Sequence, residues 1–453
     1  MSATLPSDEA MLDNLQRAAF DYFLKNTNPL HDAHNHADNH ALNHALNDPL
    51  DDPHNGLVAD TTRPGSPSSI AVVGFALSAY PIGVERGWIE RAVAVQRSLD
   101  ALRFFWTSDQ SGNADATGYQ GFYFHFLDMR SGARMWQSEL SLIDTAFLLA
   151  GMLTAAAYFT ADTKAEAELR ELADALYRRV DWRWAQRDGS CVVHGWKPEC
   201  GFLNYGWEGY SEAILLYVLG LGSPTHALTE QSFEAWTVTY QWENLYGHEF
   251  LYAGPLFIHQ FSHAWIDFRG IRDRFMREKQ CDYFENSRRA AYVQREYAIR
   301  NPHNFKGYGQ DCWGLSAGNG PSVEPRLVAG RRQAFYGYAA RGAPYGPDDG
   351  TIAGSSTLAA LVFAPQIALP AVRNWVAQAA RGEGDALRSS GFNATVGQSG
   401  ADSWLSEGEF GLDQGLIVLM IENFRSGLLW RLSRGCSYVQ TGLRRAGFRG
   451  GWL

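Results

Sequence analysis

Apolar residues recur along this chain at the three- to four-residue spacing of helices that bury one face or their whole surface. Gly- and Pro-rich stretches separate these runs and mark loops. Alternating residues at 121–128 and a short run at 190–194 predict small hairpins. The pattern therefore predicts about a dozen helices with minor β hairpins in the loops. The expected helices are 9–25, 68–85, 89–106, 138–159, 164–183, 210–221, 229–243, 255–268, 272–299, 355–364, 365–380 and 412–430.

The helices follow one another without any linker that would divide the chain, so one all-α domain over residues 1–453 is expected. Helix pairs joined by polar, chemistry-rich loops favour a closed (α/α)6 barrel. The loop at 307–350 is long and poor in helix signals, and ordered loops of that length are usually functional. Segment 31–54 is a low-complexity, His-rich run. It reads either as a metal-binding tract or as a solvated loop insertion, and its irregular spacing favours the insertion.

Composition narrows the function classes. The 453 residues carry a formal net charge of −10, and this acidic balance argues against a nucleic-acid partner. Aromatic residues make up 13% of the chain, and such abundance is typical of carbohydrate-binding grooves. The start of the chain has neither the basic nor the apolar region of a signal peptide, and no apolar run is long enough to span a membrane. A cytoplasmic protein is expected, or a periplasmic or secreted one if a leader was removed.

Segment 205–226 (YGWEGYSEAILLYVLGLGSPTH) is the most informative stretch. Trp207 and Tyr210 accompany two carboxylates, Glu208 and Glu212, which lie four residues apart and would share one face of a helix. Aromatic rings stack on pyranose faces, and carboxylates handle hydroxyl groups and protons, so the segment predicts a sugar site. The alternative is a surface turn whose acids complement a helix dipole.

Three further segments also place acids and aromatic residues together, two of them just before an apolar helix. Residues 136–151 hold Glu139 and Asp144, residues 301–320 hold Tyr308 and Trp313, and residues 404–425 hold Trp404, Glu409 and Asp413. Asp144 also suits the first turn of a helix as a capping acid. Because the inner helices of an α/α barrel are parallel, these acids should converge at one rim. Converging carboxylates are what glycoside hydrolysis needs, with one acid to protonate the leaving oxygen and one carboxylate to activate water.

Five stretches together resemble the glycoamylase-like family, which includes glycoside hydrolase family 144 and relatives acting on β-1,2-glucans. They are WQSELSLIDTAFLLAGML, HGWKPECGFLNYGWEGYSEAILLYVLGLGSPTH, NPHNFKGYGQDCWGLSAGNGP, DDGTIAGSSTLAALVFAPQIALP and GLDQGLIVLMIENFRSGLLW. The resemblance implies an (α/α)6 barrel and an inverting mechanism. It places the family's general acid on Glu212 and two further family acids on Asp144 and Asp413. The stretch 391–400 lacks the acid usual in the family at that point.

The sequence thus predicts a glycoside hydrolase for β-linked glucans, most plausibly β-1,2-glucan or its oligosaccharides. Glu212 would be the general acid, and Asp413 or Asp144 would place or activate water, with Glu208 and Glu139 as second choices. The predicted substrate-binding residues are Glu139, Trp207, Glu208, Tyr210, Tyr308, Trp313, Trp404 and Glu409. No metal or organic cofactor is implied, and the expected partner is an oligo- or polysaccharide, with no nucleic acid or membrane and no indicated oligomeric state.

Two other functions stay open at this point. A sugar isomerase or epimerase of the same barrel type would use a histidine pair, for which His259 and His263 are the nearest in spacing. A glycan-binding or glycan-remodelling protein without hydrolytic activity would fit the acid missing from 391–400. Products formed from linear β-1,2-glucan would separate the three.

Overall fold

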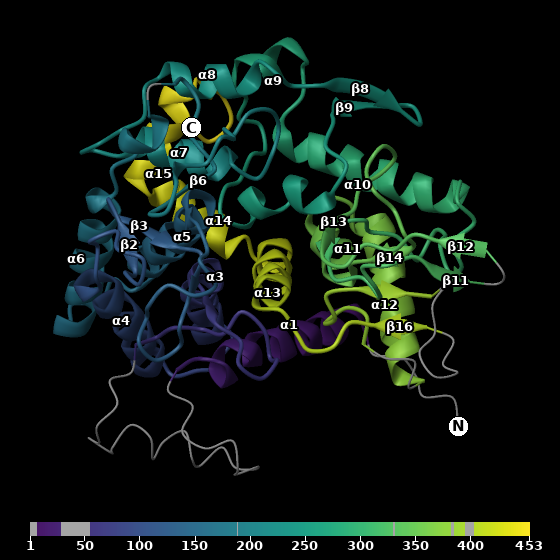
Figure 1. The fold of residues 1–453 in the computed structure, drawn as a ribbon, viewed down its shortest axis with the longest axis horizontal. Coiled ribbons are helices and arrows are strands. Elements are labelled where there is room, and N and C mark those ends of the chain that lie inside the picture. Colours follow the sequence, from purple (N-terminus) through teal and green to yellow (C-terminus); the bar gives the residue numbers. More distant parts are fainter. Residues whose placement is uncertain (1–6, 29–54, 188, 329–330, 382–384, 395–402) are drawn as a thin grey trace.

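Helices dominate the computed structural model, which describes residues 7–28, 55–187, 189–328, 331–381, 385–394 and 403–453 (Figure 1). The helices are α1 (Asp8–Lys25), α3 (Ile70–Glu85), α4 (Arg91–Thr107), α5 (Leu142–Tyr158), α6 (Lys164–Arg179), α7 (Ile214–Gly222), α8 (Gln231–Thr237), α9 (Arg274–Glu278), α10 (Tyr283–Arg300), α11 (Gly354–Ala359), α12 (Pro365–Ala380), α13 (Gly411–Arg425), α14 (Leu428–Gly435) and α15 (Ser437–Arg445). Short 3-10 turns are η1 (Trp184–Gln186), η2 (Leu256–His259), η3 (Phe261–Ala264) and η4 (Ala360–Val362).

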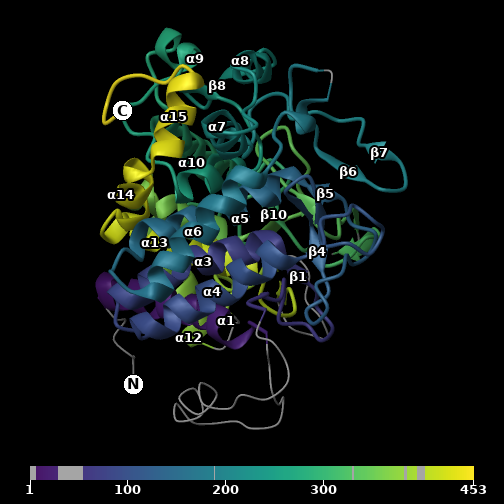
Figure 2. The ribbon, with the colours of Figure 1, turned by 90° about the vertical axis from the view of Figure 1, so that its left-hand side faces the viewer.

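The strands are short and antiparallel, and many of them gather on one side of the helices (Figure 2). The largest described sheet has the order β2-β3-β5-β6-β7, and another has the order β14-β15-β16. The strands are β1 (Ser68–Ser69), β2 (Gly118–Tyr119), β3 (Phe122–Phe124), β4 (Phe126–Leu127), β5 (Leu140–Ser141), β6 (Gly195–Lys197), β7 (Gly201–Phe202), β8 (Trp242–Leu245), β9 (His248–Leu251), β10 (Ala317–Gly318), β11 (Arg326–Val328), β12 (Arg331–Gln333), β13 (Ala339–Ala340), β14 (Thr351–Ile352), β15 (Phe392–Asn393) and β16 (Trp404–Leu405).

Helices α3, α5, α7 and α13 are buried along most of their length, as their nearly uninterrupted apolar sequences require. Helices α4 and α6 instead bury one face and expose the other. One continuous apolar core runs from Met11 to Phe448, which supports a single folding unit. Helices α3 and α5 approach closely where Gly74 faces Gly151, since a Cβ on Gly151 would stand 2.1 Å from the Gly74 carbonyl oxygen. Only glycine fits such a crossing.

The first helix packs against one of the last. Helix α1 lies against α13, and Figure 1 shows them close together below the centre of the molecule. The Gln16 side-chain amide donates to the Val418 carbonyl and to Glu422 Oε2, each at 3.0 Å. Arg425 donates to Asp13 at 2.9 Å. Helices α1 and α13, which are far apart in the sequence, are therefore held together by polar contacts.

The structure confirms the helical prediction in its general form and changes several boundaries. Helix α7 begins at Ile214 rather than at 210, so Glu208 and Glu212 lie in the preceding loop and the shared helix face predicted for them is wrong. The expected helix 255–268 is two 3-10 turns, and 272–299 is two helices, the second begun by Asp282, which accepts from the Glu285 N–H. No helix among the described residues is long and apolar enough to cross a membrane. The His-rich segment 31–54 lies outside the described residues.

Candidate active site

Buried helices begin beside the short strands, and their first turns carry the polar groups of the site. Strand β5 leads directly into α5, and Asp144 lies in the first turn of that helix. Strand β14 precedes α11, whose second residue is Ser355. Phe410 pairs with Thr61 just before α13, and Asp413 lies in the first turn of α13. This arrangement brings residues from distant parts of the chain to one end of the helices.

Glu212 has the environment of a general acid. It lies in the turn before α7, where its backbone carbonyl accepts from the Ser262 hydroxyl at 2.8 Å. Burial raises the pKa of its carboxyl to about 7, with a further contribution from Asp144. A carboxylic acid with such a pKa still carries its proton near neutral pH and can deliver it.

Asp413 is held by hydroxyl groups. The Ser355 hydroxyl donates to Asp413 Oδ1 at 2.7 Å. Burial raises the pKa of Asp413 to about 6, hydrogen bonds from Ser355 and Ser390 lower it, and Asp60 raises it. Burial likewise raises the pKa of Asp60 to about 6. Burial therefore raises the pKa of both Asp413 and Glu212 above the ordinary carboxyl range.

His125 joins two of the predicted acids. Its Nδ1 lies 2.9 Å from Glu139 Oε1, and its Nε2 lies 3.5 Å from Asp144 Oδ2. Burial lowers the pKa of His125, but Asp144, Glu139 and Asp60 together raise it to about 9. Burial opposes ionisation of Glu139, yet His125 lowers the pKa of Glu139 below its usual value. The imidazole is therefore protonated at neutral pH and supplies positive charge among the carboxylates.

The same three side chains are the described residues best placed to hold a cation. Their ligand atoms lie within 4.8 Å of one another. The donor set would suit a divalent transition metal only with a neutral histidine, because a protonated imidazole has no free lone pair. The raised pKa of His125 instead favours the ion-paired arrangement.

Tyr338 lies within electrostatic range of the whole acidic group. The pKa of its phenol is raised, first by loss of surrounding water and then by Asp413, Asp60, Asp144 and Glu212. The residue is 66% exposed, so solvent weakens both of these effects. Glu212, Asp144, Asp413 and Asp60 therefore all lie within electrostatic range of Tyr338.

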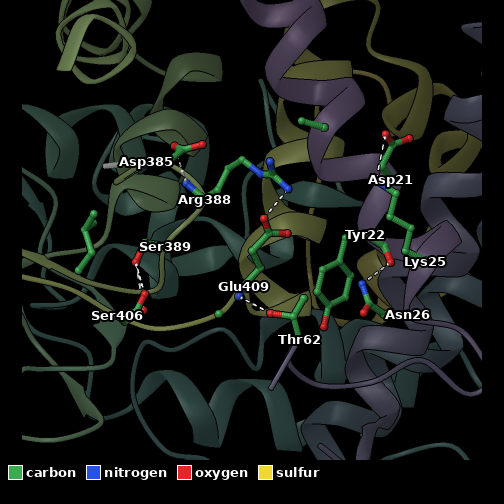
Figure 3. Close-up of a pocket in the computed structure, with 13 residues that line it drawn as sticks. Asp21, Tyr22, Lys25, Asn26, Thr62, Asp385, Arg388, Ser389, Ser406 and Glu409 are labelled. Carbon is green, nitrogen blue, oxygen red and sulfur yellow. Dashed lines mark hydrogen bonds and ion pairs between the residues drawn. The ribbon is translucent and has the colours of Figure 1, made fainter. Parts of the chain in front are cut away.

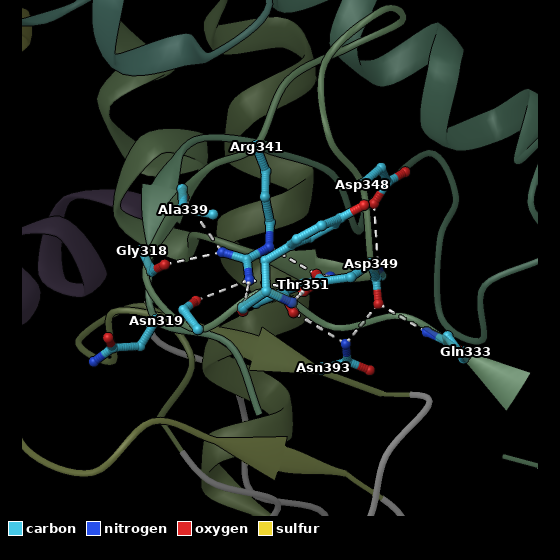
Figure 4. A network of polar contacts seen from close by, with 12 residues as sticks. Gly318, Asn319, Gln333, Ala339, Arg341, Asp348, Asp349, Thr351 and Asn393 are labelled. Atoms are coloured by element: carbon cyan, nitrogen blue, oxygen red, sulfur yellow. Dashed lines mark hydrogen bonds and ion pairs between the residues drawn. The ribbon is translucent and has the colours of Figure 1, made fainter. Parts of the chain in front are cut away.

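A buried ion pair fixes the loop that carries Tyr338 (Figure 4). Arg341 and Asp349 join at 2.7 and 2.8 Å, with side chains 1% and 0% exposed. The same guanidinium donates to the carbonyls of Tyr336 and Gly337 at 2.6 and 3.2 Å, just before Tyr338. These contacts therefore fix the backbone on both sides of Tyr338.

Most of the predicted stacking rings are wrongly assigned. Trp313 and Trp404 are only 1% and 7% exposed, so neither can present a face to a sugar. Tyr210 stacks on Tyr283 with 5.8 Å between ring centroids, and its hydroxyl bonds to Ser287 and Asn286. These rings stabilise the fold instead.

Two other predicted rings are engaged with neighbours. Trp207 is half-buried and stacks on His194, with centroids 4.1 Å apart. Tyr308 donates its hydroxyl to Asp348 Oδ1 at 2.7 Å. Neither is presented as a free platform.

Two predicted acids lie apart from the electrostatically coupled group. Glu208 is exposed in the loop before α7. Glu409 forms an ion pair with Arg388 and lines a cavity of about 590 Å³ between α1 and the segments around β16 (Figure 3). Lys25, Asn26 and Thr62 line the same cavity. Glu409 raises the pKa of Tyr22, as do Asp60 and Asp413, so this cavity adjoins the acidic group.

Three residues in or beside the acidic group escaped the sequence analysis, namely Asp60, His125 and Tyr338. His125 could have been noticed in the sequence, since it is the one histidine within the aromatic stretch 122–126. Asp60 directly follows the buried residues Leu57–Ala59. Tyr338 carried no signal beyond its place in a long loop, because only the tertiary fold brings it to the acids.

Comparison of the sequence with known protein families finds the family described as "Putative glucoamylase". The family model matches residues 204–437, and the chain belongs to this family. The family membership expected from the sequence motifs is thereby confirmed.

Individual relatives agree with this assignment. The chain is 26% identical over 479 aligned residues to the exo beta-1,2-glucooligosaccharide sophorohydrolase (non-reducing end) of Parabacteroides distasonis, covering 97% of this chain but only 58% of that protein. A solved structure called a putative glucoamylase, from Bacteroides uniformis, matches with a TM-score of 0.80 and 27% identity over 100% of both chains. The endo-beta-1,2-glucanase of Chitinophaga pinensis, in complex with sophorotriose and glucose, matches with a TM-score of 0.81 and 25% identity, covering 99% of this chain and 100% of that one.

Proposed function

We propose that this protein is a glycoside hydrolase that cleaves β-1,2-linked glucan or its oligosaccharides. The observation that carries the proposal is the placing of acids at the starts of buried helices, with Glu212 in the turn before α7, Asp144 in the first turn of α5 and Asp413 in the first turn of α13, where burial raises the pKa of both Glu212 and Asp413. Family membership supports hydrolysis, and two relatives are called β-1,2-glucan-cleaving enzymes. We further propose one (α/α)6 barrel domain over residues 1–453, supported by the continuous core and the buried helices.

In the proposed mechanism Glu212 gives its proton to the glycosidic oxygen as the bond to the anomeric carbon breaks. Asp413 takes a proton from the water that attacks the opposite face, which inverts the anomeric configuration. The Ser355 hydroxyl donates to Asp413 Oδ1 and, with Ser390, holds the carboxylate in place. His125 balances the charge of Asp144 and Glu139 beside the acid. The anomer formed first, followed by NMR, would test inversion.

The isomerase alternative finds no support in its histidines. His259 and His263 are 1% and 2% exposed. His259 Nε2 bonds to the Ala253 carbonyl at 3.1 Å, and His263 Nε2 bonds to Ser287 at 3.1 Å. Burial lowers the pKa of both rings, to about 4 and about 3, so both are neutral packing residues.

A linkage screen tests the proposed function. Linear β-1,2-, β-1,3-, β-1,4- and β-1,6-glucans and an α-1,4-glucan would be incubated with the protein, and new reducing ends measured. We expect release from β-1,2-glucan alone, with Glu212→Gln as the inactive control. Release from the α-1,4-glucan with β-1,2-glucan intact would overturn the proposal in favour of the activity in the family's description.

The pH profile of kcat/KM should be bell-shaped, with its maximum between about 6 and about 7. The reaction needs Asp413 ionised, so activity falls as pH drops through the Asp413 pKa of about 6. It also needs Glu212 protonated, so activity falls as pH rises through the Glu212 pKa of about 7. Initial rates at low substrate concentration over pH 4–9 measure both limbs. A flat profile across this range would exclude the two residues from these roles.

Asp413→Asn should lose more activity than Asp144→Asn. In our mechanism Asp413 removes a proton from water, whereas Asp144 raises the pKa of Glu212 and pairs with His125. Asp144→Asn should therefore keep some activity. Because it lowers the pKa of Glu212, the fall in activity on the basic side of the profile should shift to lower pH. Initial rates of the two variants across pH measure the difference. The opposite ranking would make Asp144 the base.

A further inference from the structure

The turn Met135–Ser138 has an unusual backbone for its sequence. The Ser138 N–H donates to the Met135 carbonyl at 2.9 Å, and the two central residues, Trp136 and Gln137, have φ of 55° and 50°. Positive φ at both central positions is the mark of a type I′ turn, which Gly, Asn and Asp dominate. Bulky residues rarely adopt this conformation, so a tryptophan here needs a reason.

Packing does not supply that reason. The Trp136 side chain is 65% exposed, although indole is the largest side chain and usually finds cover. Its ring contact is with Phe126, at 5.2 Å between centroids and an interplanar angle of 57°. Strain held at an exposed ring is typical of functional sites, where surrounding structure fixes a residue for a ligand.

The surrounding structure does fix this turn. The Met135 N–H donates to the Phe126 carbonyl at 2.8 Å. Arg134 has a side chain only 1% exposed, donates to the Ser138 carbonyl at 2.6 Å and pairs with Glu199 at 2.6 Å. Its guanidinium also lies 4.6 Å from the ring centroid of Phe124. The indole is therefore presented to solvent from a rigid base.

A row of rings connects Trp136 to the acids. Phe126 contacts Trp136 and also stacks on His125, with centroids 3.9 Å apart and an interplanar angle of 12°. His125 in turn bridges Glu139 and Asp144. Two rings, those of Phe126 and His125, thus lie between Trp136 and the acids.

We propose that Trp136 is a stacking platform for a glucose unit at an outer subsite, away from the bond that is cleaved. This inference rests on the proposed function, and it assigns chain-length preference to a named residue. An exposed indole offers a flat apolar face of the kind that covers a pyranose ring. Its contribution should grow only when the oligosaccharide is long enough to reach it.

Binding and kinetics at several chain lengths test the proposal. β-1,2-Gluco-oligosaccharides of increasing length would be titrated calorimetrically into Glu212→Gln protein with Trp136 or with Trp136→Gly, and hydrolysis followed in the active background. We expect Trp136→Gly to weaken the binding of long oligosaccharides about tenfold, equal to ~1.4 kcal/mol. The affinity for the shortest ligand should be unchanged. Trp136→Phe should restore part of the loss because it keeps an aromatic face.

Two controls separate binding from folding. Glycine adopts positive φ freely, so Trp136→Gly should melt no lower than wild type. Trp106→Ala removes a 44% exposed indole at the end of α4, and it should leave chain-length dependence unchanged.

The outcomes distinguish the two proposals. In one outcome, wild type cleaves β-1,2-glucan while Trp136→Gly keeps the wild-type ratio of long-chain to short-chain rates. That result would overturn the proposed stacking role of Trp136 and leave the proposed function standing. A loss of equal size at every chain length would also overturn the outer subsite. If wild type neither binds nor cleaves β-1,2-glucan, the proposed function itself fails.

Discussion

Glu212→Gln should reduce hydrolysis of β-1,2-glucan by about 10²-fold or more, the usual contribution of a general acid. Glutamine keeps the size and hydrogen-bonding capacity of the side chain but has no proton to give. The side chain lies in the turn before α7, and burial together with Asp144 raises its pKa to about 7. Rates over a range of enzyme concentrations would measure the loss. If the variant kept a tenth of the wild-type rate, Glu212 would not be the general acid, and another residue would have that role.

The same variant should fold at least as well as wild type. A carboxyl whose pKa is raised in the folded state favours folding least once pH exceeds that value, here about 7. Glutamine cannot ionise, so the melting temperature of Glu212→Gln at pH 8 should equal or exceed that of wild type. Glu230→Gln, a change at an exposed acid, is the matched control and should leave activity and melting temperature unchanged. A large drop in melting temperature for Glu212→Gln would mean that lost activity reflects lost structure.

Arg341→Met should lower the free energy of unfolding by about 3–5 kcal/mol, because it leaves a buried carboxylate without its partner. Arg341 and Asp349 are almost fully buried, and the guanidinium also satisfies loop carbonyls. Urea unfolding followed by circular dichroism would measure the change. Activity should fall as well, since this loop carries Tyr338 beside the acids.

Two comparisons make the stability prediction specific. Arg103→Met removes an exposed ion pair to Glu168, with side chains 47% and 41% exposed, and should cost only ~0–1 kcal/mol. The double variant Arg341→Met/Asp349→Leu removes both charges and should be more stable than Arg341→Met alone. An Arg341→Met protein as stable as Arg103→Met would show that Asp349 finds another partner or water.

The buried helices could be predicted from the sequence, whereas the conformations of the loops could not. The apolar runs of α3, α5 and α13 predict buried helices because no other structure hides so many apolar residues in succession. The prediction for segment 205–213 was wrong. Two carboxylates four residues apart suggest one face of a helix, but Gly209 has φ +77° and the segment is a turn. The break between α9 and α10 depends on the Asp282 cap, a local competition that an apolar pattern does not record.

At the candidate site, too, some features could be predicted from the sequence and others could not. Acids beside apolar helices were predictable, because the first turn of a buried helix is a fixed position relative to its neighbours, as Asp144 and Asp413 illustrate. The aromatic residues were not. Tryptophan and tyrosine serve both cores and sugar sites, and the sequence alone could not tell buried Trp313 from exposed Trp136.

The pairing of α1 with α13 has a consequence for how the protein is made. Gln16 meets Glu422 across 406 residues of sequence, so helix α1 leaves the ribosome long before its partner exists. Contacts of such separation form late, because the intervening chain must be ordered first. Helix α1 therefore reaches its final place only after α13 has been made, and until then the face that it packs against α13 stays uncovered.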